Sequence, residues 1–362
     1  MKRFPSGWRL VLASIVCLLL GGLSVPAFAA RPSSATTNTG TGGFNITTSP
    51  LPVQLSTTPG GVVNTSLRVE NSGTAPVKIK VSLLKFKAAS DDGRPLLLKR
   101  QPGDTFFDWV TFSKDDFVAQ PGVWNDIAMT INPPKQAAFG YYYAVVFSQD
   151  TGGQTPTAPN TSQLNGATAT LILLNVQAPG EKRQLTVTSF KSSRGLYEYL
   201  PATFSVTVHN GGNIYTAPTG NIFISRDHVH DIAVLNVNSG GGNILPKSNR
   251  IFQATWSDGF PVFATKRDHG QIISDNQGKP IEQLQWNSNR VGKFRFGHYY
   301  AHLLLVYDNG TRDVPINAEV GFWVLPWKIL PLILGLLILL VVGLFSSGRV
   351  ILHTMRKSRR KR

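Results

Sequence analysis

The sequence predicts an all-β protein with two tandem immunoglobulin-like β-sandwich domains, followed by one transmembrane α-helix. Short apolar stretches that alternate with period two recur along the chain, as in VVNTSLRVE and VKIKVSL. No stretch between residues 44 and 320 keeps a helical period for three turns. A single long apolar run stands near the C-terminus, at residues 322–345. Barrels remain an alternative to the sandwiches.

Turn signals rich in Gly, Pro, Asn and Asp divide the alternating region into two segments, residues 44–178 and 185–321, joined by a linker at 179–184. Each segment holds about seven strands, the number typical of an immunoglobulin-like sandwich. The expected strands are 44–48, 62–70, 76–87, 109–113, 124–132, 140–148 and 167–177, then 185–190, 203–209, 221–225, 231–237, 250–256, 295–306 and 313–323. Residues 257–292 form a polar insertion in the second segment.

The N-terminus has the pattern of a secretory signal peptide over residues 1–30. Basic residues precede an apolar run at 10–25, and small residues predict cleavage after Ala29 or Ala30. An uncleaved N-terminal anchor is the alternative. Residues 31–43, RPSSATTNTGTGG, form a flexible spacer.

The C-terminal apolar run predicts a transmembrane helix over residues 322–346. Its length of roughly 36 Å, at about 1.5 Å per residue, is enough to cross a bilayer. Trp323, Trp327 and Lys328 are expected at the membrane interface. The tail, residues 347–362, is basic and has no acidic residue. The positive-inside rule therefore places the tail in the cytoplasm and both sandwiches outside the cell.

Charge and cysteine content narrow the function classes. The formal net charge is +16, but seven of the basic residues lie in the tail and three in the signal peptide. The rest is only mildly basic, so no nucleic-acid partner is expected. Cys17 in the signal peptide is the only cysteine. A mature chain without disulfides depends on its two hydrophobic cores for stability.

Two motifs repeat in the same order in both segments. LRVENSGTAPV at 67–77 parallels VTVHNGGNIYTAP at 206–218, where an alternating strand is followed by an Asn-led turn. FGYYYA at 139–144 parallels FGHYYA at 296–301. These matches predict a duplicated domain.

The second repeated motif suggests the tyrosine corner of immunoglobulin-type domains, in which a Tyr hydroxyl bonds an upstream backbone group. We expect Tyr142 and Tyr299 to form these corners. Their neighbours Tyr141 and Tyr143, and His298 and Tyr300 in the second copy, then point to the opposite face.

The same stretches resemble the WxL-interacting proteins of Gram-positive bacteria. The first half, with FNITTSPLPVQLSTTPGG, WVTFSKDDFVAQPG and FGYYYAVVF, is similar to their peptidoglycan-binding domain. The second half, with HNGGNIYTAPTGNIFI and FWVLPWK, is similar to their host-binding domain. The resemblance implies a membrane-anchored surface protein that binds cell-wall peptidoglycan or a surface protein.

The sequence holds no recognisable catalytic motif, and we expect neither an enzyme nor a cofactor. His228 and His230 in DHVHD are the one candidate metal pair, although polar residues are equally expected in a hairpin. Aromatic residues that could contact a partner, or fill the core, are Phe106, Phe107, Trp109, Tyr141 and Tyr143.

Three hypotheses for function follow. The first is a non-enzymatic surface protein that binds peptidoglycan or a surface protein. The alternative is an envelope chaperone or scaffold subunit that pairs with client strands through an exposed sheet edge, which requires a long, uncharged strand left open in the fold. The third, a metal-dependent hydrolase centred on DHVHD, requires bound metal.

Overall fold

The computed structural model of the 362-residue chain describes residues 45–150, 167–226 and 231–359, with side chains up to residue 349. The expected signal peptide and spacer lie outside the described residues, as do His228 and His230.

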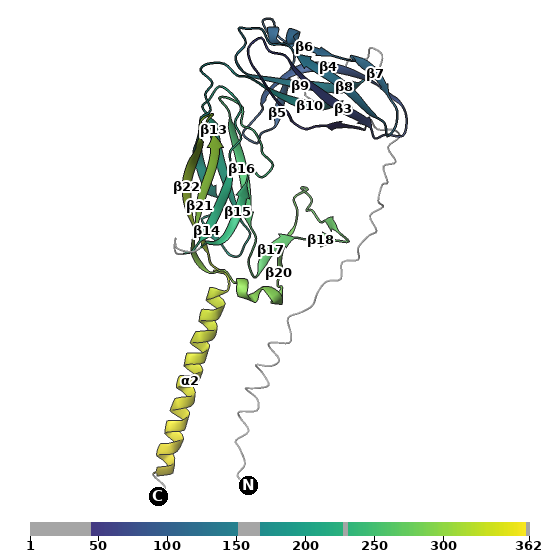
Figure 1. Cartoon of the computed structure of the whole chain (residues 1–362). Helices are drawn as coiled ribbons and strands as arrows, with labels where there is room; N and C mark the ends of the chain where they lie inside the picture. Colours follow the sequence, from purple (N-terminus) through teal and green to yellow (C-terminus); the bar gives the residue numbers. More distant parts are fainter. Residues whose placement is uncertain (1–44, 151–166, 227–230, 360–362) are drawn as a thin grey trace. The chain divides into compact units, whose positions relative to one another are not determined.

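The first segment folds into two packed sheets (Figure 1). One sheet has the order β1 (Ile46–Ser49), β3 (Val63–Asn71), β8 (Trp124–Ile131) and β6 (Val110–Phe112). The other has the order β2 (Val53–Thr57), β10 (Ala167–Val176), β9 (Phe139–Gln149), β4 (Val77–Ala88) and β5 (Pro95–Leu98), and β7 (Asp116–Ala119) also pairs with β4. The short 3-10 helix η1 (Thr105–Trp109) precedes β6.

The second segment repeats the two-sheet arrangement. Its smaller sheet is β11 (Leu185–Ser192), β13 (Ala202–Asn210) and β16 (Asn249–Trp256). Its larger sheet is β12 (Leu196–Tyr197), β22 (Asp313–Val324), β21 (Gly297–Asp308), β14 (Thr219–Ser225) and β15 (Asp231–Val237). The insertion forms β17 (Val262–Thr265) with β20 (Glu282–Gln285), β18 (Arg267–Asp268) with β19 (Gln271–Ile272), and the 3-10 helix η2 (Ser288–Lys293).

The predicted all-β fold class is therefore confirmed, and every strand expected from the alternation is present. Strict alternation explains this success: in β13 every second residue is buried between the sheets. Strands β2, β5, β7 and β12 were not expected, because two to five residues are too few to show a period.

A buried asparagine closes the same turn in both sandwiches. The Asn71 side chain donates to the carbonyls of Ala75 (2.7 Å) and Ala119 (3.1 Å) and accepts from the Gly73 N–H (2.9 Å). Asn210 makes the equivalent three bonds, to the carbonyls of Ile214 and Ile244 and from the Gly212 N–H, each 2.8 Å long. Both asparagines are fully buried. This shared contact supports the duplication inferred from the sequence.

The tyrosine corner is present in both sandwiches, but in the first it is made by a different tyrosine from the one expected. The Tyr299 hydroxyl accepts from the Phe296 N–H at 3.1 Å, as a corner requires. In the first sandwich the equivalent bond, 3.3 Å from the Ala138 N–H, goes to Tyr141. The expected corner at Tyr142 is wrong.

A shift in backbone conformation explains this difference. The residue with positive φ is Gly297 (118°) in the second copy, but it is Phe139 (69°), one motif position earlier, in the first. Moving the strand start by one residue exchanges the faces of all following side chains. Tyr141 and Tyr143 therefore face the core between the sheets, while Tyr142 packs on the outer face against Phe86, 5.9 Å away between ring centroids.

The C-terminal helix begins later than expected. Residues 322–324 complete β22, because Phe322 and Val324 are fully buried in the core of the second sandwich. Helix α2 (Leu330–Arg359) follows, and within it the stretch Leu330–Arg349 is long and apolar enough to cross a membrane. It is the one such helix in the described part of the chain.

Candidate functional site

Half of the outer edge of β10 has no strand paired to it among the described residues, although β1 lies near this half. All ten residues of β10 pair with β9 on one side, but β2 covers only Ile172–Val176 on the other. No described strand pairs with Ala167–Leu171 on that side. The strand reads ATATLILLNV, with no charge and no proline. Such an edge presents unpaired backbone N–H and C=O groups to a further strand.

Two prolines determine where the edge is open. The chain leaves β1 in one sheet and enters β2 in the other through Pro50 and Pro52. The parallel pairing starts at Val53 opposite Ile172, so its continuation would place Pro52 opposite Leu171. Proline has no N–H to donate to a ladder, so β2 cannot extend along the rest of β10. Near the open half, the Thr168 hydroxyl donates to the Ile46 carbonyl at 3.3 Å.

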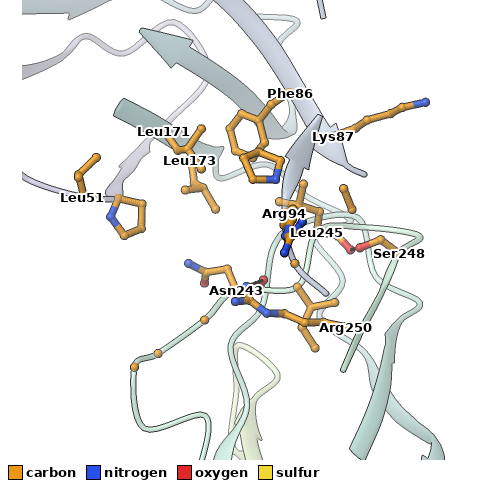
Figure 2. A pocket seen from close by; sticks show the side chains of 18 of the residues that line it. Leu51, Phe86, Lys87, Arg94, Leu171, Leu173, Asn243, Leu245, Ser248 and Arg250 are labelled. Carbon is orange, nitrogen blue, oxygen red and sulfur yellow. Dashed lines mark hydrogen bonds between the residues drawn. The ribbon is translucent and has the colours of Figure 1, made fainter. Parts of the chain in front are cut away.

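The outer face of β10 continues into a cavity of about 540 Å³ (Figure 2). Leu171, Leu173 and Phe86 form an apolar wall on the side of the first sandwich. Residues 240–245 and 248–250 of the second sandwich line the opposite side. The open edge and the cavity thus share one apolar surface.

The polar rim of this cavity is basic. Lys87, Arg94 and Arg250 are among its lining residues, which include no acidic side chain. Arg250 donates to the Asn243 carbonyl at 2.7 Å, and burial lowers the pKa of its guanidinium. Arg94 pairs with Asp92 at 3.0 Å, which reduces the net positive potential at the rim.

The segment between the sandwiches is bonded to both of them. The Asn175 side chain donates to Glu181 at 3.1 Å, and Glu181 pairs with Arg183 at 2.9 Å. Arg183 in turn donates to Asp308 at 2.7 Å. A backbone bond of 2.6 Å from the Ile251 N–H to the Asp91 carbonyl adds a second link.

The aromatic residues considered for partner contact form a cluster that closes one end of the first core. Phe106 packs on Phe107 and Tyr143, and Trp109 packs on Tyr141, with centroid distances of 4.7–5.4 Å. The Tyr143 hydroxyl donates to the Phe106 carbonyl at 3.1 Å. Tyr143 is fully buried, so it cannot contact a partner, and the expectation for this residue is wrong.

The cluster gives a test of the corrected corner. We expect Tyr141→Phe to lower the stability of the first sandwich by about 1 kcal/mol, since it removes one hydrogen bond. Tyr142→Phe should change stability by less than about 0.5 kcal/mol, because its buried hydroxyl has no hydrogen-bond partner among the described residues. The Tyr215 backbone lies near the Tyr142 hydroxyl, but not in the geometry of a hydrogen bond. Burial raises the pKa of this hydroxyl. Urea unfolding of both variants measures the two changes in stability. A larger loss of stability for Tyr142→Phe than for Tyr141→Phe would contradict the corner at Tyr141.

One constellation that the sequence did not reveal resembles a hydrolytic triad. His302 Nε2 and Ser225 Oγ are 3.0 Å apart, and His302 Nδ1 lies 2.9 Å from Glu319. Three separate strands bring these residues together, which only the strand pairing could show. Ser225 is only 1% exposed, so its hydroxyl is not accessible to a substrate carbonyl. The described residues also contain no group of three or more potential metal ligands.

The residues expected at the membrane interface lie just before α2. Trp323 and Trp327 are each 50% exposed. Trp323 belongs to β22, and its ring lies 4.7 Å from that of His298. Lys328 pairs with Glu198 at 2.6 Å. Their role at a membrane stays a prediction.

No protein-family model matches this chain, and no curated protein matches it. Solved structures with a similar fold include the fimbrial chaperone CfaA, which is 17% identical over 67% of this chain and 100% of the chaperone, with a TM-score of 0.32. A chain of the CsuC–CsuE chaperone–adhesin complex of Acinetobacter baumannii is 9% identical over 75% of this chain and 97% of its own, with a TM-score of 0.33.

A chain of the Salmonella enterica complex of the SafA pilin with the SafB chaperone is 11% identical over 76% of this chain and 97% of its own, with a TM-score of 0.32. Values this low carry no inference about function. The resemblance to WxL-interacting proteins is not tested by these similarities and stays a prediction.

Proposed function

We propose that this chain is a non-catalytic, membrane-anchored chaperone or scaffold that binds an extended segment of a partner protein along the open half of β10. The observation that carries the proposal is an uncharged, proline-free strand whose residues Ala167–Leu171 lack a described neighbour on one side. An added strand gains its affinity from main-chain hydrogen bonds and its specificity from alternate side chains.

The surroundings of the edge suggest the chemistry of the partner. Every second side chain of a segment added to the open half of β10 would lie beside Ala167, Ala169 and Leu171, at the margin of the apolar surface that continues to Leu173 and Phe86. The basic rim favours a neutral or acidic segment over a basic one. The partner is therefore a strand-forming segment with alternating apolar residues and few positive charges. Helix α2 would anchor the protein in the membrane.

This proposal favours the chaperone or scaffold hypothesis over the binding of cell-wall polymer. Several of the structural neighbours are chains from complexes of a chaperone with a pilin or adhesin subunit. The proposal is argued from β10, because those similarities are too weak to support it. Peptidoglycan binding, which rests on the family resemblance alone, stays a prediction.

Hydrogen exchange of the full chain in nanodiscs tests the proposal. The probe is a synthetic peptide of about seven residues that alternates valine and threonine, within the usual length of a strand. At a concentration about ten times its Kd, the peptide should slow amide exchange across residues 167–171 by about tenfold. A peptide that is N-methylated at every residue, which has no N–H to donate along either edge, should give no protection.

Two lysine variants complete this test. Leu171→Lys places a charge on the apolar surface and should abolish the protection. Val118→Lys is the matched control, because Val118 is 54% exposed on β7, away from β10 in the same sheet. It should leave the protection unchanged. Equal protection by the plain and the N-methylated peptide, or none by either at millimolar concentration, would refute strand addition.

A further inference from the structure

The insertion, taken together with the residues 293–296 that lead from it into β21, exposes an unusual set of large apolar side chains. Trp286 is 62% exposed, Val291 56%, Phe294 50% and Phe296 43%. The Trp286 ring packs edge-on against Phe260, with 5.7 Å between centroids. Single exposed apolar residues are common on proteins, but a group of this size on one segment indicates an interaction surface.

Basic residues accompany these side chains. The stretch 286–296 contains Arg290, Lys293 and Arg295 and no acidic residue. Lys293 and Arg295 pair with Asp258 at 2.7 and 3.2 Å, which closes the base of the insertion and lowers the pKa of Asp258. Within the described residues Arg290 has no ion pair, so its charge is available to an external anion.

Strand pairing places this surface close to the start of α2. Phe294 bridges to Phe260, and Gly297 pairs with Val324 at the end of β22. Val324 precedes the first helical residue, Leu330, by six positions. Even a fully extended connection of this length spans only about 20 Å.

The connection is also bonded to the sandwich. The Leu325 N–H donates to the Tyr197 carbonyl at 2.7 Å, and Lys328 pairs with Glu198 at 2.6 Å. Two exposed tryptophans lie here, Trp323 near the end of β22 and Trp327 in the middle of the connection. The exposed residues of the insertion are therefore continuous with the point at which the chain would enter a bilayer.

We propose that the insertion is a membrane-docking platform, in which Trp286, Val291, Phe294 and Phe296 enter the headgroup region of the leaflet from which the second sandwich emerges. Aromatic rings are favoured at this depth, and Arg290 and the neighbouring cations suit lipid phosphates. This inference rests on the membrane anchoring by α2 proposed above. It assigns a role to a segment that strand addition at β10 does not use.

Site-directed spin labelling of the full chain in nanodiscs with anionic lipid tests the platform. Cys17 is the only native cysteine, so Cys17→Ser provides a background for single labels. The test position is Val291→Cys. The controls, Val118→Cys in the first sandwich and Leu337→Cys in α2, are 54% and 53% exposed, which matches the 56% of Val291. Each label is measured for its collision rates with oxygen, which is enriched in lipid, and with a water-soluble nickel complex.

We expect the label at 291 to collide with the nickel complex several-fold less than the label at 118, and with oxygen more. An equal nickel accessibility at 291 and 118, with 337 protected, would overturn the platform while leaving the anchor intact. A fully water-exposed label at 337 would instead show that the anchor fails, and the platform with it. Spin–spin broadening at 291 that disappears on dilution with unlabelled chain would assign the surface to self-association and overturn the proposal.

Discussion

Replacing Phe322 by alanine is expected to lower the free energy of unfolding of the second sandwich by about 3–5 kcal/mol, the usual loss for removing a buried aromatic ring. Phe322 is 1% exposed and packs on Phe204 and Trp256, with centroid distances of 5.2 and 6.1 Å. Alanine would leave a cavity between the two sheets, which the strands on either side cannot close. Urea unfolding of the full chain in detergent, followed by hydrogen exchange of peptides from residues 202–256, measures the loss.

The matched control is Phe345→Ala in α2, where the ring is 64% exposed and lies in the candidate membrane span. This variant should leave the unfolding of the sandwich unchanged. The sequence-based prediction placed Phe322 both at the end of the strand 313–323 and at the start of the transmembrane helix 322–346, and this comparison decides between the two. If both phenylalanines could be replaced without cost to the sandwich, the strand assignment of residues 322–324 would be wrong.

Asn210→Ala is expected to destabilise the second sandwich by about 3 kcal/mol. The change leaves the buried Ile214 carbonyl and the Gly212 N–H without their partner, and it removes one of the two hydrogen bonds to the Ile244 carbonyl, which keeps the one from the Thr216 N–H at 3.1 Å. Each unsatisfied buried group costs about 1–3 kcal/mol, and relaxation of the turn recovers part of that sum. Exchange protection should fall across β13 and β16 and stay unchanged in the first sandwich, whose own asparagine is intact.

Asn309→Ala is the control for this variant. The Asn309 side chain also makes three hydrogen bonds, in all of which it is the acceptor, from Thr311 N–H, Thr311 Oγ1 and Arg312 N–H, but these bonds are exposed to solvent. Water can replace them, so the loss should stay below about 1 kcal/mol. If both variants lost the same free energy of unfolding, the burial of the Asn210 hydrogen bonds would not explain their contribution to stability.

The parts of the fold that could be predicted from the sequence are those set by local patterns. Alternation located the long strands, and the repeated Asn-led turns indicated the duplication, because Asn71 and Asn210 bond to groups within the same turn as well as beyond it. The faces of Tyr141 and Tyr142 could not be read from the repeated motif. The faces depend on which residue adopts positive φ. This residue is Phe139 in the first copy and Gly297, one motif position later, in the second.

The candidate site was less accessible to sequence analysis. An uncharged strand at 167–177 was expected, but whether its edge is open depends on pairing with β2, which is more than a hundred residues away in the chain. Pro50 and Pro52 were the available signal, since a proline cannot continue a ladder. The docking surface was similarly hidden, because Trp286 lies within the polar residues 257–292 and Phe294 and Phe296 lie just beyond them, before the strand.

The bonded connection between β22 and α2 has a mechanical consequence. A pull on the protein from a bound partner would reach the bilayer through β22, which is paired along its whole length with β21, from Asp313 to Val324, and at its end with β12. Tension that enters at Val324 acts along the strand, so the ladder bonds are loaded together in shear and do not open one after another. With the membrane anchor and the strand addition proposed above, the second sandwich would transmit force between a held segment and the membrane without unravelling from its C-terminal end.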